Sequence, residues 1–436
     1  MLCPECGEDN TPKEAMDTSK KLTMVIIALV ALIAVLVGII VMGMGGMDGG
    51  EDTTGAPETT AAPATTPADG NPDDATCKGT YTAAAQKVME ANTEVVATMG
   101  EHTLTNGELQ VFYWVGIYNF LDYNGYYLAG LGLDLPRSLD TQVCTLEGYE
   151  KMTWQQYFLS EALLTWQRYM ALTVDAESVQ FQLAEDYAEA LKNLETNLEA
   201  AAKEDGYENI QGMMDDQLGG GCVFADYESY MYQYYMGYLY YDSLCSEIDV
   251  SEDEIKAFFE ENKDAYAAEG LTEDYMFYDV RHVLIEPVSA EGAETYTDEE
   301  WEACRVKAQG LLDAWLADGG TEEGFADMAK EHSADSNADK GGIYEDLSKD
   351  TNFVPEFKAW YVDESRVPGD SGLVKTVYGY HLMYFVGSEP AWPAYAEGDL
   401  VTTRQNEILD EAVAKHPMEV DYSKIWLGDV VLASAS

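Results

Sequence analysis

The sequence predicts an α+β fold with a small mixed domain, a mainly helical domain before it and one N-terminal transmembrane helix. Three observations lead to this prediction. Residues 22–44 form an apolar run of membrane-spanning length. Apolar residues then recur three and four positions apart over much of residues 79–275, as they do on one face of a helix. Finally, residues 276–388 read as strand, helices and strand in that order, which is typical of an α+β domain.

The composition is strongly acidic. The 436 residues include 24 Lys and Arg against 80 Asp and Glu, so the formal net charge is −56. Such a chain repels nucleic acid and anionic lipid headgroups, because both are bound through Lys and Arg. We therefore expect no nucleic-acid partner. The acidic surface serves solubility, or alternatively attracts basic client proteins.

The apolar run at residues 22–44 predicts an uncleaved membrane anchor. No charged residue lies between Lys21 and Asp48, and about 20 apolar residues suffice for a helix to cross a bilayer. A cleaved signal peptide is the alternative, but its apolar region usually has only about 7–15 residues. Neither a convincing cleavage site nor a lipid-attachment Cys follows the run. We therefore expect a single-pass signal anchor.

The charges beside the run predict its orientation. Residues 1–21 carry three lysines just before the run, whereas the first charged residues after it are acidic. The positive-inside rule then keeps the N-terminus in the cytoplasm and places the globular part on the extracytoplasmic side of the cell membrane. Residues 45–78 are rich in Thr, Ala, Pro, Gly and acid, so we expect a disordered linker there.

The cysteines indicate neither a full metal site nor a disulfide framework. Cys3 and Cys6 form a CPECG motif, which is half of a zinc knuckle in the predicted cytoplasmic tail. A structural zinc site needs four ligands, so these two would need a second chain to bind metal. The other five are odd in number and scattered, and we expect buried free thiols. They are Cys77, Cys144, Cys222, Cys245 and Cys304.

Residues 79–275 read as a mainly helical, chaperone-like domain. A strand at 95–99 and a turn at Gly100 precede a helix that begins near Asn106, and the spacing predicts helix over 176–204. Ser251 and Glu254 form a capping box for another helix. Two stretches, 111–127 and 227–241, are unusually rich in aromatic residues. These are either core-facing helices or an adaptable surface that holds unfolded chains.

Over residues 276–388 the spacing of the apolar residues changes from that of a strand to that of helices, and then back to that of a strand. Alternating residues over 276–286 predict a buried strand, with Val280 and His282 on one face. A capping box at Thr297 and Glu300 opens an amphipathic helix that ends at the glycine pair 319–320. A shorter helix, a polar loop and a helix opened by Pro355 follow. The segment ends on a second strand, in which His381, Met383 and Phe385 share a face.

At these positions the chain resembles the parvulin family of peptidyl-prolyl cis-trans isomerases. The matching motifs stand in the right order and at nearly the right spacing, and the wider layout is similar to the PrsA and SurA class of secretion foldases. The resemblance implies a four-stranded antiparallel sheet with helices. The motifs are RHVLI at 281–285, GFADMAKEHSAD at 324–335, GG at 341–342, FVPEF at 353–357 and PGDSGLVKTVYGYHLMYF at 368–385.

The resemblance also implies a site that needs no cofactor. Isomerisation breaks no bond, so an apolar cup for the proline ring and a polar network beside its carbonyl suffice. Each residue also has a simpler interpretation, since buried histidines, loop aspartates and core phenylalanines are common. The implied catalytic residues are His282, Asp335, Thr376 and His381, and the implied substrate-binding residues are Tyr344, Phe353, Phe357 and Met383.

Departures from the family pattern leave two functions open. Val354 replaces a common polar residue, and residues 343–345 replace a frequent Leu-Gly pair. We expect an isomerase and foldase for unfolded or proline-containing secreted polypeptides, or alternatively an inert parvulin unit in a holdase with an aromatic helical surface. Residues 287–295 lack Lys and Arg, which disfavours phosphorylated targets. Residues 389–436 are expected to pack back on the helical domain, and the oligomeric state stays open.

Overall fold

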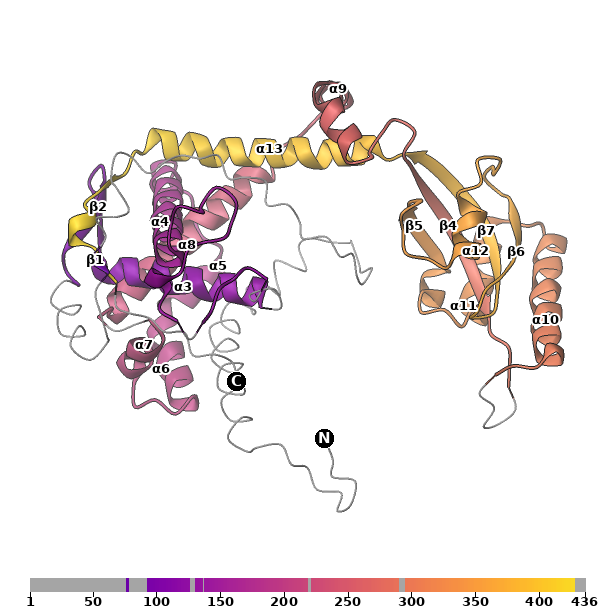
Figure 1. The fold of residues 1–436 in the computed structure, drawn as a ribbon, viewed down its shortest axis with the longest axis horizontal. Helices are drawn as coiled ribbons and strands as arrows, with labels where there is room; N and C mark the ends of the chain where they lie inside the picture. The colour runs from indigo at the N-terminus through magenta and orange to yellow at the C-terminus, as the bar shows by residue number, and fades with distance from the viewer. Residues whose placement is uncertain are drawn as a thin grey trace, which may run out of the picture. The chain divides into compact units, whose positions relative to one another are not determined.

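The computed structural model describes residues 76–77, 92–125, 130–135, 137–218, 221–289 and 295–427 (Figure 1). The predicted cytoplasmic tail with Cys3 and Cys6, the anchor at 22–44 and nearly all of the linker lie outside these residues. Within them, no helix is both long enough and apolar enough to span a membrane. The chain divides into two compact units, one of Met1–Glu247 with Gln405–Ser436 and one of Ile248–Arg404.

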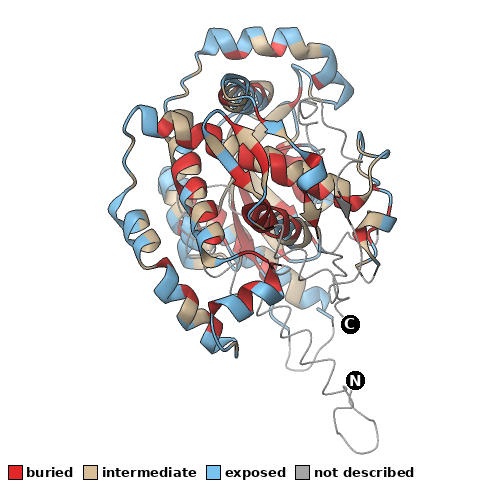
Figure 2. Ribbon diagram, turned by 90° about the vertical axis from the view of Figure 1, so that its left-hand side faces the viewer, coloured by how far each residue is buried: buried red, intermediate tan, exposed pale blue. Residues whose placement is uncertain are grey.

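The first unit is mainly helical. Its three longest helices, α3 (Asn106–Asn124), α4 (Trp154–Ser178) and α8 (Phe224–Cys245), pack on one another around a single apolar core (Figure 2). Shorter elements surround them. They are η2 (Leu139–Thr141), α5 (Glu185–Lys192), α6 (Leu194–Glu204), α7 (Ile210–Gln217), η4 (Tyr422–Lys424), the sheet β3-β2-β8 (His102–Thr105, Val95–Met99, Glu419–Val420) and the parallel pair β1 and β9 (Thr76–Cys77, Trp426–Leu427).

The aromatic stretches belong mostly to this core. In α3, Phe112, Tyr113 and Trp114 are buried, and the Phe112 ring meets that of Tyr230 on α8 edge to face at 4.8 Å. In α8, Tyr232 is 38% exposed, whereas Tyr235 is buried and Tyr238, Tyr240 and Tyr241 are half-buried. Because aromatic residues at helical spacing usually face a core, the structure favours the core-facing interpretation over an aromatic surface.

The helix expected over 176–204 is wrong in extent. The chain leaves α4 after Ser178, where Val179 is 59% exposed and Gln180 has a left-handed φ of 59°. It resumes as α5 and breaks again at Asn193 before α6. The spacing of apolar residues is little affected by the local conformations that end a helix. The helical spacing therefore continues past two positions at which the helix ends.

The last part of the chain lies in the core of the first unit. Helix α13 (Trp392–Lys415) leads into it, and Ile425 and Leu427 are fully buried. The side-chain amides of Asn106 and Gln110 donate to the carbonyl of Trp426 at 3.1 and 2.7 Å. Cys144, Cys222, Cys245 and Cys304 are free, and all of these four except Cys245 are buried.

The second unit contains the four-stranded antiparallel sheet that the family resemblance implied. The strand order is β5-β4-β7-β6, so β4 (Met276–Ile285) and β7 (Tyr380–Pro390) occupy the centre. The edge strands are β5 (Ile343–Leu347) and β6 (Ser371–Lys375). The helices are α9 (Glu252–Ala268), α10 (Asp298–Ala317), α11 (Glu322–His332), η3 (Ala338–Lys340) and α12 (Pro355–Tyr361).

Helices cover both faces of this sheet. On one face α10 and α11 pack against Val283, Ile285 and Leu382. On the other face α12 packs against Val280 and Met383, and this layer also contains the buried Phe357. The capping boxes expected before α9 and α10 are both present. Because alternate residues of β4 and β7 point to opposite faces, His282 and His381 share the α12 face.

Candidate active site

The centre of the site is a pair of buried histidines on the two central strands. His282 on β4 and His381 on β7 are 1% and 5% exposed, and their rings stack with centroids 5.3 Å apart. The two Nδ1 atoms are 3.1 Å apart, so one of them carries a hydrogen and the other accepts it. The sheet register explains this contact, because His282 lies opposite Met383, two residues beyond His381.

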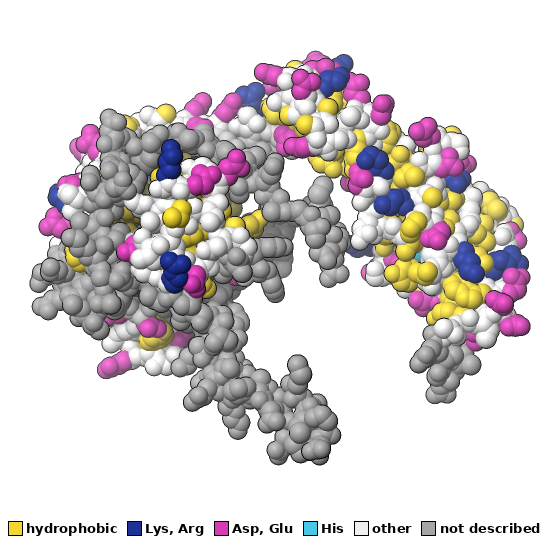
Figure 3. All heavy atoms as spheres, in the orientation of Figure 1, with side chains coloured by type: hydrophobic (Ala, Val, Ile, Leu, Met, Phe, Trp, Pro, Cys, Tyr) yellow, Lys and Arg dark blue, Asp and Glu magenta, His cyan; other side chains and the backbone are white. Residues whose placement is uncertain are grey.

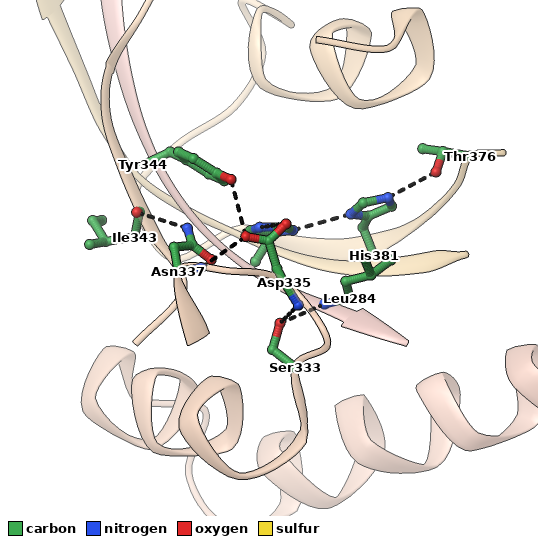
Figure 4. Close-up of polar contacts among 9 residues, drawn as sticks. Leu284, Ser333, Asp335, Asn337, Ile343, Tyr344, Thr376 and His381 are labelled. Carbon is green, nitrogen blue, oxygen red and sulfur yellow. Dashed lines mark hydrogen bonds and ion pairs between the residues drawn. The ribbon is translucent and has the colours of Figure 1, made fainter. Parts of the chain in front are cut away.

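The hydrogen bonds of the histidine pair continue to Thr376 on one side and to Asp335 on the other, and the charge of Asp335 decides their direction. The backbone N–H of Tyr378 donates to Oγ1 of Thr376 at 3.1 Å, and this hydroxyl lies 2.9 Å from Nε2 of His381. If the hydroxyl donates to His381, that ring donates from Nδ1 to His282, whose remaining hydrogen on Nε2 then faces Asp335. The opposite direction would turn a bare nitrogen of His282 toward a carboxylate. We therefore assign the first arrangement. Figure 4 shows the polar contacts along this chain of side chains, from Thr376 to Asp335.

Asp335 ends this chain of side chains. Its Oδ2 lies 3.4 Å from Nε2 of His282, which has no other polar partner. Burial alone would raise the pKa of Asp335, but the hydrogen bond and charge interaction with His282, with the donors Asn337 and Tyr344, outweigh burial and lower the pKa to about 2. The carboxylate is therefore ionised at every physiological pH.

The polar loop that carries Asp335 is built by side chains that mimic a turn. Oγ of Ser333 accepts from the backbone N–H of Leu284 at 3.1 Å and of Asp335 at 3.2 Å, which ties the loop to β4 (Figure 4). The amide of Asn337 donates to the carbonyl of Ile343 at 3.0 Å. The positioning roles of Ser333 and Asn337 were missed from the sequence, although Ser and Asn near an Asp are typical turn formers.

Three aromatic rings form a wall beside the histidines. The ring of Phe353 lies 5.0 Å from that of Phe357 and 5.1 Å from that of Tyr344. Phe357 also meets both histidine rings edge to face, at 5.2 and 5.3 Å. The structure thus brings together seven of the eight site residues expected from the sequence. The eighth, Met383, is fully buried in the layer beneath and presents no surface to a ligand.

Phe353 and Tyr344 are the parts of this wall that keep exposed surface, since Phe357 is only 2% exposed. Val354 is also half-buried and packs against the same layer. Apolar side chains gather on the face of the second unit shown in Figure 3, among both basic and acidic side chains. In the described part of the chain, no three His, Cys, Asp or Glu side chains are grouped to hold a metal ion.

The neutral state of His381 predicts a pH dependence of stability. Burial, followed by the neighbouring His282, lowers the pKa of His381 from 6.5 to about 4. The unfolded chain therefore binds more protons than the folded domain between these values, and stability falls as the pH drops through this window. Between pH 7 and 5 we expect a loss of about 1–2 kcal/mol.

Hydrogen exchange of the full-length chain measures this loss locally, in peptides from β4 and β7 and with intrinsic exchange rates taken into account. A His381→Gln variant removes the titrating ring and should remove most of the difference between pH 7 and 5. An unchanged difference in the variant would assign the pH dependence to other groups.

The part of the chain that carries this site is similar to a known protein family. Residues 268–387 match the family described as the PPIC-type PPIASE domain. No curated protein sequence matches the chain. Similar solved structures include PrsA from Bacillus subtilis, with 17% identity, coverage of 64% of this chain and 91% of that chain and a TM-score of 0.25. Another is the peptidyl-prolyl isomerase ESS1 from Candida albicans, with 20% identity, coverage of 32% and 80% and a TM-score of 0.21.

PrsA from Bacillus anthracis is similar at 16% identity, with coverage of 58% of this chain and 96% of that chain and a TM-score of 0.19. These TM-scores are low, whereas the family match covers the candidate site itself. The match spans β4, β5, β6 and most of β7, and it includes every residue of the histidine chain. Residues 268–387 are therefore a domain of the PPIC-type peptidyl-prolyl isomerase family, and the parvulin resemblance of the sequence is confirmed.

Proposed function

We propose that this protein is an active peptidyl-prolyl isomerase that assists the folding of proline-containing secreted polypeptides. The observation that carries the proposal is an ionised carboxylate, Asp335, joined to the buried histidines and set 3.1 Å from the hydroxyl of an aromatic wall residue, Tyr344. An apolar wall beside a fixed charge can bind a proline ring and lower the barrier to rotation about an X-Pro amide.

The chemistry follows from amide resonance. A planar amide places negative charge on its carbonyl oxygen, and this charge decreases when the amide twists toward the transition state. A carboxylate held beside the oxygen therefore destabilises the planar amide more than the twisted one. Because only such a difference accelerates rotation, Asp335 acts on the barrier of about 18–20 kcal/mol without forming any bond.

The aromatic wall supplies the binding energy. The exposed parts of Phe353 and Tyr344 offer an apolar surface to the proline ring, while the buried Phe357 packs on Phe353 and on the ring of His282. The histidine chain is preorganised, because each hydrogen bond fixes the tautomer of the next ring. It therefore keeps the donor of His282 directed at Asp335 without reorganisation during the reaction.

The proposed site of action is outside the cytoplasm. The apolar run at 22–44, flanked by lysines on its N-terminal side, anchors the protein in the cell membrane with both described units on the extracytoplasmic side. Protease added to intact cells should then degrade the part of the chain after the anchor. Complete protection of that part, with a known surface protein degraded in the same sample, contradicts the proposed orientation.

The alternative of an inert holdase has less support. It depends on an aromatic surface, but of the aromatic side chains of α3 and α8 only Tyr123 and Tyr232 are exposed, and the others are buried or half-buried. One of the departures that favoured it, at residues 343–345, brings the hydrogen bond from Tyr344 to Asp335. A folded full-length chain that suppresses client aggregation without isomerase activity would nevertheless support it.

A protease-free isomerisation assay on the full-length chain tests the proposal, with an unphosphorylated X-Pro peptide. We expect acceleration by the native chain and a several-fold rise in KM for Phe353→Ala, because a half-buried wall residue contributes mainly to binding. Val367→Ala serves as the control, since Val367 is 57% exposed in the turn before β6. A folded chain that gives no acceleration contradicts the proposal.

A further inference from the structure

Tyr344 does more in this structure than line the wall. It stands on the edge strand β5, and its hydroxyl donates to Oδ1 of Asp335 at 3.1 Å (Figure 4). We propose that Tyr344 is a positioning residue, whose hydroxyl holds the Asp335 carboxylate so that Oδ2 is directed at the substrate amide. The inference rests on the proposed isomerase function, and it assigns the hydroxyl a role separate from that of the ring.

The two oxygens of Asp335 have different surroundings. Oδ1 accepts from the hydroxyl of Tyr344 and from the backbone N–H of Asn337, both at 3.1 Å. Oδ2 meets only Nε2 of His282, at 3.4 Å, which is longer than an ordinary hydrogen bond. The carboxylate is therefore held through Oδ1, and Oδ2 keeps capacity to interact with a bound peptide.

The ring that carries the hydroxyl is held on two sides. The Tyr344 ring packs edge to face on Phe353 at 5.1 Å and lies 5.2 Å from the ring of His282. Its strand is paired with β4, where Tyr344 lies opposite Val280. A ring fixed in this way has little freedom to move its hydroxyl, so the hydrogen bond costs little conformational entropy.

The hydroxyl also stays a donor under all relevant conditions. Burial, the negative charge of Asp335 and the hydrogen bond to it raise the pKa of Tyr344. The phenol is therefore protonated throughout the physiological range and cannot repel the carboxylate. A leucine at this position would provide an apolar wall without a donor.

Two substitutions separate the hydroxyl from the ring. Tyr344→Phe keeps the wall and removes the donor, so in the full-length chain we expect kcat to fall about tenfold with KM changed less than twofold, the loss of one hydrogen bond to a charged group. Tyr344→Leu should give the same fall in kcat together with a higher KM. If Tyr344→Phe changes KM alone, the hydroxyl has no positioning role.

A double-mutant cycle tests whether the hydroxyl acts through Asp335. In an Asp335→Asn background we expect Tyr344→Phe to change kcat less than twofold, because no charge is left to orient. Equal effects in both backgrounds would show that Tyr344 acts independently of the carboxylate and would overturn the inference.

A spectroscopic measurement separates this inference from the isomerase proposal. The chain has only five histidines, so ¹⁵N-histidine labelling gives few ring signals, and a His282→Gln variant identifies those of His282. Tyr344→Phe should shift the Nε2 signal of His282 and leave that of His416 unchanged. This result is independent of activity, so it supports positioning even if the native chain proves inert. An unchanged His282 signal contradicts the inference.

Discussion

Replacing Asp335 by Asn should lower kcat for X-Pro isomerisation about a hundredfold. Asn keeps the shape of the side chain, and its oxygen still accepts from Tyr344 and from the backbone of Asn337, as Oδ1 of Asp335 does. The substitution therefore removes little besides the charge. A preorganised electrostatic contact in a site of this kind is commonly worth about 2.7–4 kcal/mol, which corresponds to a factor of about 10²–10³.

The matched control for this prediction is Asp339→Asn. Asp339 lies on η3 in the same loop and is exposed. Its substitution by Asn changes the net charge by the same amount as that of Asp335. We expect it to alter kcat less than twofold. The assay is the protease-free one, with folding of each variant checked by circular dichroism. Nearly native kcat in Asp335→Asn would show that the carboxylate acts only as a turn former, which was the simpler interpretation of this residue.

The features that could be predicted from the sequence are those with local physical causes. The box at Thr297 and Glu300 satisfies backbone donors within a single turn, and α10 begins there as expected. Alternation along β4 and β7 likewise predicts that His282 and His381 face the same layer. Their pairing across the sheet came from the family resemblance, because the sequence pattern alone does not indicate which strands are neighbours.

What could not be predicted depends on three-dimensional packing. Met383 shares a strand face with His381, but the register places it opposite His282 and beneath α12, where no ligand reaches it. Tyr344 stands on a different element from Asp335, beyond the glycine pair, so nothing local reveals that its hydroxyl reaches the carboxylate. The end of α4 after Ser178 could not be predicted from the sequence either. Gln180 adopts a left-handed backbone conformation there, which is usually adopted by Gly or Asn.

The glycine pair of the loop offers the largest expected effect on stability. Gly342 has a φ of +67°, and a Cβ placed on it would lie 2.1 Å from the carbonyl oxygen of His282. Its own carbonyl accepts the N–H of His282 at 2.8 Å, so the loop is held directly against β4. We expect Gly342→Ala to destabilise the second unit by about 3 kcal/mol or more, because the obstacle is backbone and cannot rotate away.

Two control variants separate the causes of this loss. Gly369 has a φ of +95°, and a Cβ added to it would have no atom within 4 Å, so Gly369→Ala reports the cost of the backbone conformation alone, about 1–2 kcal/mol. Gly310 lies in open space within α10, and Gly310→Ala should stabilise by about 0.5–1 kcal/mol.

Hydrogen exchange in peptides from β4 and β7 of the full-length chain measures all three variants on one scale. Gly342→Ala should also lose isomerase activity at temperatures where it remains folded, since the shift of β4 begins at His282 itself and moves its ring away from Asp335. If Gly342→Ala lowers the free energy of unfolding by no more than Gly369→Ala does, the loop can move away from β4 without loss of stability. The contact of 3.4 Å between His282 and Asp335 would then be adjustable, and the preorganisation on which the proposed electrostatic effect depends would be absent.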